Sequence, residues 1–488
     1  MAFRFEEFVF IGVHSWLKYS MVLPELIEIV PLDKPVRAEI TVPGSKSITN
    51  RALILAALAD GEVTLQGALW SEDSQIMVEC LQELGFMVNV APDPNEVCNR
   101  TITVYGQGGK VPGGGTAENP LDLFVGNAGT AARFLAALVC LGKGVYRLHG
   151  VPRMHERPQA ALFKALRELG YRVDSPNDKL PAVIFGSSRR ESAQTYSGRN
   201  QSRLTAAATV SIEESSQFAS ALLLCAKQGG WEVKVVGENA EESPYVAMTA
   251  KLIEVFPMRG GEFEIEPDAS SGSYFWGCNS NYKAHRLRTP KPTTEQKSDW
   301  SRGKRRFEVW AKNFNIGEVT VANWPETRWQ VDRDFPLVFP FDNVISRQSK
   351  LGDSIMTAIV LSPFALEKMV FTHLERLRVQ ECERVIALRT ELTKCGAKII
   401  ETGDALEILP SSLHGAEIET YNDHRMAMCF AILGLKVPGI KIKNPACVKK
   451  TFPNFFQKVA APPPQGLGAT ILDAKTGRKL ELKELFAE

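Results

Sequence analysis

The 488-residue sequence lacks several features that would place it in a broad class at once. Its nine cysteines are scattered, odd in number and without Cys-x-x-Cys spacing, which argues against a disulfide framework and a zinc site. The same cysteine usage predicts a reducing, cytoplasmic location. No run of about eighteen apolar residues occurs, so no membrane span is predicted. The net charge is only +1, which predicts no global attraction to nucleic acid or to a membrane.

Common catalytic and nucleotide-binding motifs are also missing. GSKSITNR (residues 44–51) resembles a P-loop, but Ser45 stands where that motif needs glycine before its lysine. No HExxH is present, no GxGxxG stands in a suitable context, and no nucleophilic triad is apparent. Any site must therefore be built from local groups of charged and polar residues.

One such group follows Gly44. Ser47 can cap a helix by accepting from free backbone N–H groups, and Arg51 lies four residues on, on the same face. Free N–H groups, the positive end of the helix dipole, Lys46 and Arg51 would then point at one spot. This arrangement predicts an anion site.

The same pattern, a polar turn followed by an apolar helix of small residues, occurs six times in the chain, counting this first copy. Strand-like runs such as RTITVYG and KLPAVIFG lie between the copies. Six such units, three in each half, predict an α/β protein built by duplication, with six helix N-termini facing one cleft. The six starts are Ser47, Thr130, Ser216, Ser271, Asp353 and His424.

Three further turns are rich in cations: residues 151–158, 376–384 and 447–455. With Lys46, Arg51 and Arg425 they could hold a substrate pair rich in phosphate and carboxylate. Asp353 and Glu381 are the candidate acid and base among them, their pKa values set by cationic neighbours and burial.

Seven blocks in order resemble the 5-enolpyruvylshikimate-3-phosphate synthase family of enolpyruvyl transferases. The resemblance spans roughly residues 24 to 460 and implies a two-domain α/β fold, each domain made of three βαβαββ repeats around buried parallel helices. It also implies a monomer that needs neither a metal nor a cofactor. The blocks are GSKSITNRALILAALADG, LFVGNAGTAARFLAAL, PRMHERP, SSQFASALL, DASSGSYF, ETYNDHRMAMCF and KKTFPNFF.

The resemblance also predicts domain boundaries. Residues 1–22 are an extension, natural or vector-derived, and 466–488 are a C-terminal tail. The chain crosses between the domains twice, so the first domain is discontinuous, 23–45 plus 266–465, and the second is 46–265.

The implied reaction transfers the enolpyruvyl group of phosphoenolpyruvate to the 5-hydroxyl of shikimate 3-phosphate. Lys46, Asp353 and Glu381 match the catalytic residues, and Lys46 and Asp353 also match substrate contacts. The residues that match the phosphoenolpyruvate clamp are Gly129, Arg157, Arg384, Arg425 and Lys450. Those that match the shikimate 3-phosphate side are Ser47, Arg51, Ser215, Ser216, Gln217, Tyr245 and Gln380.

Four positions depart from the family pattern. Gln380 stands where Lys is usual, Arg376 where Asn is usual, and Glu242 where Ser is common. Phe134 replaces a common Pro, which would fit the first turn of a helix. A shifted helix start would weaken binding of glyphosate, the family's phosphoenolpyruvate-site inhibitor. Alternatively, Phe134 packs in the core and leaves the turn unmoved.

Two segments, 187–205 and 278–310, carry no family character. They are either surface insertions or stretches read in a different frame, and the second would interrupt the helix that DASSGSYF begins. Three alternatives to the implied reaction stay open: enolpyruvyl transfer to a UDP-amino sugar, nucleic-acid binding through the basic run 283–306, and a folded but inactive relative.

Overall fold

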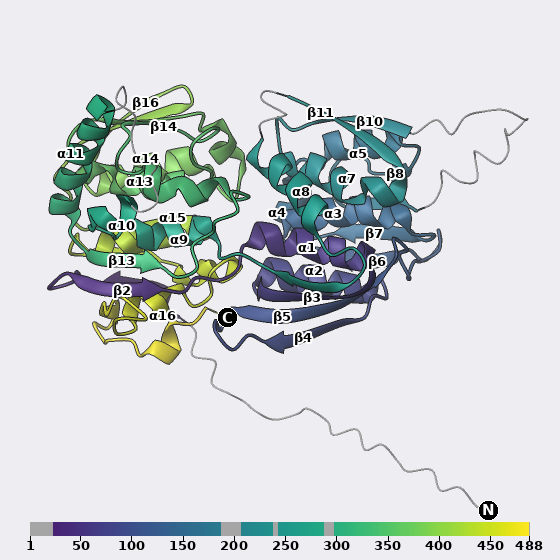
Figure 1. The fold of residues 1–488 in the computed structure, drawn as a ribbon, viewed down its shortest axis with the longest axis horizontal. Coiled ribbons are helices and arrows are strands. Elements are labelled where there is room, and N and C mark those ends of the chain that lie inside the picture. Colours follow the sequence, from purple (N-terminus) through teal and green to yellow (C-terminus); the bar gives the residue numbers. More distant parts are fainter. Residues whose placement is uncertain (1–22, 187–205, 238–242, 287–296, 488) are drawn as a thin grey trace, which may run out of the picture.

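The computed structural model describes residues 23–186, 206–237, 243–286 and 297–487. The predicted extension 1–22, the segment 187–205 and Glu242 therefore lie outside the described residues. Within them the molecule forms two halves that lie side by side (Figure 1). Each half has its own cluster of buried apolar residues. The cluster of the first half is drawn from residues 23–42 and 269–487, and that of the second half from residues 48–265.

The half around the 48–265 cluster holds three sheets in the described part of the chain. In the first sheet the neighbouring strands are, in order, β12 (Gly261–Glu264), β3 (Asp60–Leu69), β5 (Asn99–Gln107) and β4 (Val88–Pro92). In the next sheet they are β6 (Leu121–Phe124), β7 (Val145–His149), β9 (Ala182–Phe185) and β8 (Arg172–Asp174). The last sheet pairs β10 (Ala206–Ser211) with β11 (Trp231–Val236). Each sheet begins with a parallel pair, and the two larger sheets continue antiparallel.

The other half repeats this plan. Its described sheets are β14 (Val344–Ser346), β15 (Met369–Thr372), β17 (Ala405–Leu409) and β16 (Lys398–Thr402); β18 (Glu417–Ile418), β19 (Ile440–Lys443), β1 (Leu26–Ile29) and β20 (Ile471–Asp473); and β13 (Gly317–Val321) with β2 (Val36–Ile40). Parallel and antiparallel pairs follow in the same order as before. The six predicted strand-and-helix units are therefore present.

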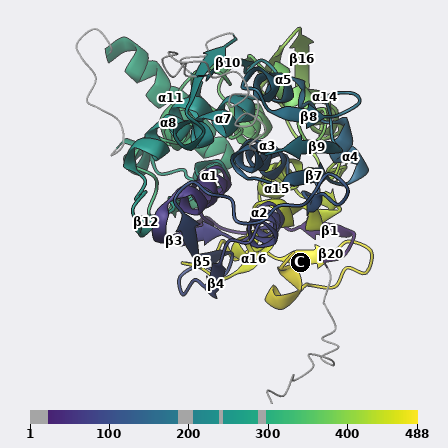
Figure 2. The same cartoon turned by 90° about the vertical axis from the view of Figure 1, so that its right-hand side faces the viewer.

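Six helices of small and apolar residues form the two cores. They are α1 (Lys46–Leu58), α3 (Gly129–Leu138), α7 (Ser216–Gly229), α9 (Ala269–Trp276), α13 (Ile355–Leu361) and α15 (His424–Gly434). Each begins within two residues of a predicted start. In the view onto the second half, α1, α3 and α7 lie between its sheets (Figure 2). Their buried faces require residues that are apolar nearly all round.

Amphipathic helices pack against the core helices and the inner faces of the sheets. They include α2 (Glu72–Glu83), α5 (Ala160–Glu168), α8 (Pro244–Val255) and α14 (Arg384–Lys394), with short helices α4 (Pro152–Glu156), α10 (Tyr282–Arg286), α12 (Phe335–Val338) and α16 (Phe455–Ala460). Helix α2 contacts α1 and α3, α8 contacts α7, and α14 contacts α13. No helix in the described ranges is long and apolar enough to cross a bilayer.

The basic segment 278–310 is partly folded. It leads into α11 (Lys297–Phe314), and Phe307, Trp310 and Phe314 of that helix are at most 1% exposed in the core of the first half. Lys304 pairs with Glu308 of the same helix at 3.5 Å. The eight residues of α9 are all buried, so the shortened helix is still a core element. Residues 287–296 of this segment lie outside the described residues.

The chain crosses between the halves at two points that lie side by side. The amide of Ser45 donates to the carbonyl of Glu266 at 2.8 Å, and that of Asp268 donates to the carbonyl of Pro43 at 2.8 Å. The division of the two apolar clusters supports the predicted domain boundaries, which we keep as a proposal. Residues 466–487, expected as a tail, add β20 to the sheet of β1 and bury Leu480 and Leu485 in the first cluster.

Candidate active site

A cleft of about 150 Å³ lies between the two halves, where the six buried helices begin. It is lined by Ser47 of α1, Thr130 of α3, Ser216 of α7, Ser270 of α9, Asp353 just before α13, and His424 of α15. Of the predicted site residues, those that line it are Lys46, Ser47, Arg51, Arg157, Ser215, Ser216, Gln217, Tyr245, Asp353, Gln380, Glu381, Arg384 and Arg425. Gly129 lies beside Arg157, and Lys450 contacts Glu381.

The first turn of α1 differs from the predicted one. The helix begins at Lys46 with Ser45 as its N-cap, so the prediction that Ser47 caps it is wrong. The Ser45 hydroxyl is buried without a hydrogen-bond partner in the described structure. Because Ser47 is the second residue of the helix, its hydroxyl is not needed for capping. Lys46 Nζ lies 3.2 Å from Asp73 Oδ2.

The Arg51 side chain points from α1 toward α7 and α8 of the same half. Its guanidinium donates to Thr249 Oγ1 at 2.7 Å, to Ser220 Oγ at 3.0 Å and to the carbonyl of Ser47 at 2.8 Å. Burial lowers the pKa of Arg51 to about 10, so the side chain keeps its charge at neutral pH. Arg51 thus ties α1 to α7 and α8 while also lining the cleft.

The ring of Phe134 lies beneath Arg51, with the guanidinium carbon 5.3 Å from the ring centroid. Phe134 is the sixth residue of α3 and is fully buried. Residue 134 is past the first turn, so the premise that it stands in that turn is wrong, and its burial agrees with the alternative that Phe134 packs in the core. The glyphosate affinity itself stays a prediction.

Asp353 stands among three arginines. Its carboxylate lies 2.8 Å from Arg347 Nη2, 3.3 Å from Arg425 Nη2 and 3.8 Å from Arg384 Nη1. Burial would raise the pKa of Asp353, but Arg425, Arg347 and Arg384 outweigh it and hold the pKa well below its usual range. The carboxylate is therefore ionised, which is the form that can accept a proton.

Glu381 is held in a similar way. Its two oxygens lie 3.2 Å from Lys450 Nζ and 2.8 Å from Arg384 Nη2. Burial would raise its pKa, but Lys450, Arg384 and more distant cations including Lys46 lower it well below the usual value. Arg384, fully buried and also paired with Asp423 at 2.7 Å, links the two candidate acid–base groups.

Near the start of α3 the cleft has a second group of cations. A Cβ added to Gly129 would lie 2.7 Å from Arg133 Nη1 and 2.8 Å from Arg157 Cζ, so glycine lets both guanidinium groups approach the backbone. Arg133 donates to Gln217 Oε1 at 2.7 Å, and Gln217 in turn donates to Thr130. Burial, followed by repulsion from Arg157, lowers the pKa of Arg133 to about 9. Arg133 is a site residue that was not predicted, because a single arginine inside an apolar helix carries no motif.

The starts of α7 and α8 form the part of the cleft next to Arg133, which donates to Gln217 of α7. Ser215 caps α7 by accepting from the Gln217 amide, and Tyr245 is the second residue of α8. Gln380 accepts a bond from Arg384 and carries no charge of its own. Two arginines face this part of the cleft, Arg376 and the unpredicted Arg347.

His424, the first residue of α15, is 1% exposed and has no hydrogen-bond partner for either ring nitrogen among the described residues. Burial, then the positive charge of Arg425, lowers its pKa well below the usual value, although Glu381 acts in the opposite direction. His424 is therefore neutral at neutral pH.

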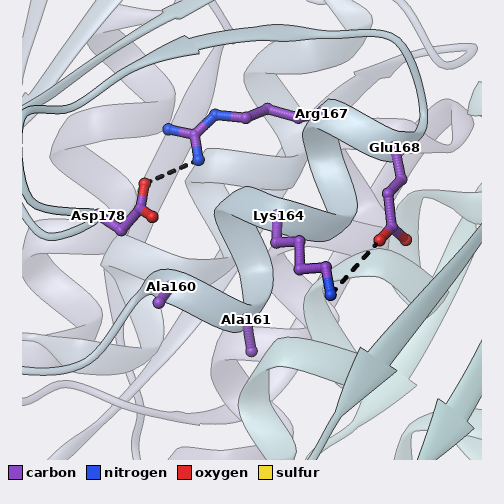
Figure 3. A pocket seen from close by; sticks show the side chains of 6 residues that line it. All are labelled: Ala160, Ala161, Lys164, Arg167, Glu168 and Asp178. Carbon is purple, nitrogen blue, oxygen red and sulfur yellow. Dashed lines mark hydrogen bonds and ion pairs between the residues drawn. The ribbon is translucent and has the colours of Figure 1, made fainter.

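A separate surface hollow, away from the cleft, is lined by residues of α5 and by Asp178 (Figure 3). Its charged residues pair with one another: Arg167 with Asp178 at 2.7 Å and Lys164 with Glu168 at 4.0 Å. These side chains are at least one-third exposed. Compensated surface charges give this hollow no catalytic group, and the cleft between the halves is the candidate active site.

Comparison with known proteins shows the family of this chain. The sequence model of EPSP synthase (3-phosphoshikimate 1-carboxyvinyltransferase) matches residues 31–259 and 341–459. The chain belongs to the EPSP synthase family. A 3-phosphoshikimate 1-carboxyvinyltransferase of Trichormus variabilis is 36% identical over 457 residues, covering 89% of this chain and 98% of that protein. One of Opitutus terrae is 34% identical, covering 90% and 98%.

Solved structures show the same fold at lower identity. The EPSP synthase of Acinetobacter baumannii aligns with a TM-score of 0.61 at 19% identity, covering 91% of this chain and 99% of that one. The enolpyruvyl transferase NikO of Streptomyces tendae aligns with a TM-score of 0.56 at 15% identity, covering 94% and 99%. The family match leaves 260–340 between its two stretches, which includes the basic segment around α11.

Proposed function

We infer that this EPSP synthase family member transfers the enolpyruvyl group of phosphoenolpyruvate to the 5-hydroxyl of shikimate 3-phosphate and releases phosphate, a step of the shikimate pathway to aromatic amino acids. The observation that carries this proposal is the pair of ionised carboxylates, Asp353 and Glu381, each surrounded by cations where six helices begin. Two anionic substrates can be held together only where positive charge offsets their repulsion.

In the addition step the 5-hydroxyl attacks C2 of phosphoenolpyruvate while C3 gains a proton, and a tetrahedral intermediate results. Asp353, in its ionised form, takes the hydroxyl proton. Glu381 and Lys450, 3.2 Å apart, form the pair that exchanges a proton with C3. Bound anions offset the cations around Glu381 and raise its pKa, which lets the carboxyl carry that proton.

In the elimination step C3 loses a proton to Glu381 and phosphate departs, giving the enol ether. Lys46, Arg157, Arg384, Arg425 and Lys450 neutralise the phosphoenolpyruvate groups in this proposal. Ser47, Arg51, Ser215, Ser216, Gln217, Tyr245 and Gln380 hold shikimate 3-phosphate. The chemistry asks for no metal or organic cofactor, as the resemblance implied.

A monomer in the cytoplasm remains part of the proposal. All nine cysteines are free thiols, as is usual in a reducing compartment.

A phosphate-release assay with phosphoenolpyruvate and shikimate 3-phosphate tests the proposal. We expect turnover with this pair and none when a UDP-amino sugar replaces shikimate 3-phosphate. Lys46→Met and Asp353→Ala should each lower kcat by about 10²-fold or more. Asp342→Ala is the matched control, because Asp342 pairs with Lys350 at the surface. Absence of phosphate release from the folded wild-type protein would favour an inactive relative.

A further inference from the structure

A second cavity, of about 360 Å³, adjoins the active-site cleft. Both cavities are lined by Tyr245, Arg347 and Arg376, so these three side chains stand at the junction between them. Ser243 and His373 line the second cavity beyond the junction.

Arg376 reaches this junction from the opposite half. It lies in the short 3-10 helix Glu375–Val379, and its guanidinium donates to the carbonyl of Ile212 at the end of β10, across the cleft. In the described part of the chain no carboxylate forms an ion pair with it. A carbonyl is a poor partner for a guanidinium, whose planar set of donors matches phosphate or carboxylate oxygens in pairs.

Arg347 adds a second, more deeply buried charge. Its side chain is 8% exposed, and its Nε is buried without a hydrogen-bond partner in the described structure. The only carboxylate that it contacts among the described residues is Asp353. Burial and the nearby Arg347 both lower the pKa of Arg376, which reflects repulsion between the two guanidinium groups. An anion between them would relieve that repulsion.

The start of α7 completes the surroundings. Ile212 is followed after two residues by Ser215 and Ser216, the N-cap and first residue of this 14-residue helix. Their hydroxyls and the free N–H groups of the helix start line the cleft on the side to which Arg376 reaches. Gln380 lies four residues after Arg376, is neutral, and accepts a hydrogen bond from Arg384.

Arg133 reaches the same helix start through Gln217. Glu213 and Glu214 line the two cavities there. Arg376 is therefore the cation at this helix start that comes from the opposite half.

We propose that Arg376, with Arg347 behind it, binds the phosphate of the ring substrate at the start of α7 and makes the enzyme specific for the phosphorylated ring. This inference rests on the proposed function. It places phosphoenolpyruvate at Gly129 and Arg157, and the ring phosphate at Arg376 and Ser216. Arg376 exchanges the Ile212 carbonyl for phosphate oxygens when the substrate binds.

Steady-state kinetics of Arg376→Met with shikimate 3-phosphate and with unphosphorylated shikimate test the proposal. We expect kcat/KM for shikimate 3-phosphate to fall by about 10- to 100-fold, the usual loss for one charge-assisted hydrogen bond. The kcat/KM for shikimate and the KM for phosphoenolpyruvate should change less than about threefold. Arg376→Lys should recover part of the loss, because a lysine keeps the charge but not the paired donors.

Arg378→Met is the matched control. Arg378 lies in the same 3-10 helix but pairs with Glu383 and Glu401 outside the cleft, so its loss should leave the ratio of the two substrates unchanged. An equal loss for both ring substrates in Arg376→Met would mean that Arg376 only holds the halves together, and would overturn the proposal. An unchanged kcat/KM for shikimate 3-phosphate would overturn it too. A wild-type enzyme without turnover would instead refute the proposed function.

Discussion

At the scale of single residues, the cleft holds its two acid–base groups in their charged forms. Asp353 and Glu381 are only 15% and 14% exposed, which alone would favour the neutral acid, yet both pKa values are lowered because arginines and Lys450 surround them. The charges that prepare the cleft for anions also keep its acids ionised. Substrate binding must therefore change the protonation of Glu381 before it can donate to carbon.

Replacing Glu381 by glutamine should separate binding from chemistry. Glu381→Gln removes one negative charge from among Lys450 and Arg384 and leaves an excess of positive charge in the cleft. We expect kcat to fall by about 10²-fold or more, because an amide cannot exchange the proton, while the KM for phosphoenolpyruvate does not rise. Steady-state kinetics measure both constants.

Glu383→Gln is the control for this variant. Glu383 lies two residues away and caps α14 by accepting from the Ile386 amide. Losing its charge should leave kcat near the wild-type value and lower the stability by about 1 kcal/mol or less. A Glu381→Gln enzyme with nearly normal kcat would remove Glu381 from the catalytic residues.

His424 should make the protein less stable in mild acid. In the unfolded chain its imidazole binds a proton near pH 6.5, but in the folded chain burial and Arg425 keep it neutral. Below about pH 6.5 the unfolded state therefore binds the extra proton, and stability falls by up to about 1.4 kcal/mol for each further pH unit. Asp353 and Glu381, whose folded pKa values are lowered, add a loss only below about pH 4.5.

Denaturant unfolding at pH 7.5, 6.5 and 5.5 measures this dependence. His424→Gln should flatten the slope between pH 6.5 and 5.5, whereas His414→Gln, at an exposed site, should keep it. Equal slopes in wild type and His424→Gln would show that another group titrates in this range.

At the scale of elements, the six core helices are predictable and the contacts between them are not. Runs such as ALILAALA are apolar on every side and follow a polar turn, which leaves few folds in which they can be buried. Arg133 and Arg347 carry no local motif, and only the packing of distant segments brings them to the cleft. The start of α1 was misplaced because Ser45 and Ser47 are both suitable caps.

Helix α11 was missed for a different reason. Its basic residues suggested a solvated loop, although Phe307, Trp310 and Phe314 recur at helical spacing and lie on one buried face. That spacing predicts an amphipathic helix, which a count of the charged residues alone does not reveal. The remainder of the first core, including residues 466–487, depends on strand pairing between chain ends that local sequence does not specify.

The position of Phe134 within α3 leads to a stability prediction. Phe134→Pro would remove the amide that residue 134 donates inside the helix, together with the ring beneath Arg51. We expect a loss of about 3 kcal/mol in the free energy of unfolding. Phe134→Leu keeps the amide and should lose about 1 kcal/mol from the cation–π contact and packing. Chemical denaturation compares the two, and equal losses would contradict a continuous helix at this position.

At the scale of the whole molecule, the cleft depends on how the two halves meet. Near the chain crossings Glu96 of the second half pairs with Lys458 of the first at 2.7 Å and accepts from Asn454 at 2.7 Å. At the cleft, Arg376 reaches Ile212 from the other side. The first contacts are buried and need no ligand, whereas the second lies where we place the ring phosphate.

Shikimate 3-phosphate should therefore stabilise the two halves together. A ligand that binds only the folded cleft adds about 2.7 kcal/mol at 100 times its Kd, which for halves of this size corresponds to roughly 5 to 10 °C in Tm. Differential scanning fluorimetry measures the shift, and size-exclusion chromatography with and without the ligand should show a monomer in both states. Shikimate at the same concentration is the control and should raise Tm less, because it lacks the group that joins Arg376 to the start of α7. A saturating concentration of shikimate 3-phosphate that left Tm unchanged would contradict the substrate assignment. A larger shift with shikimate would instead contradict the phosphate contact.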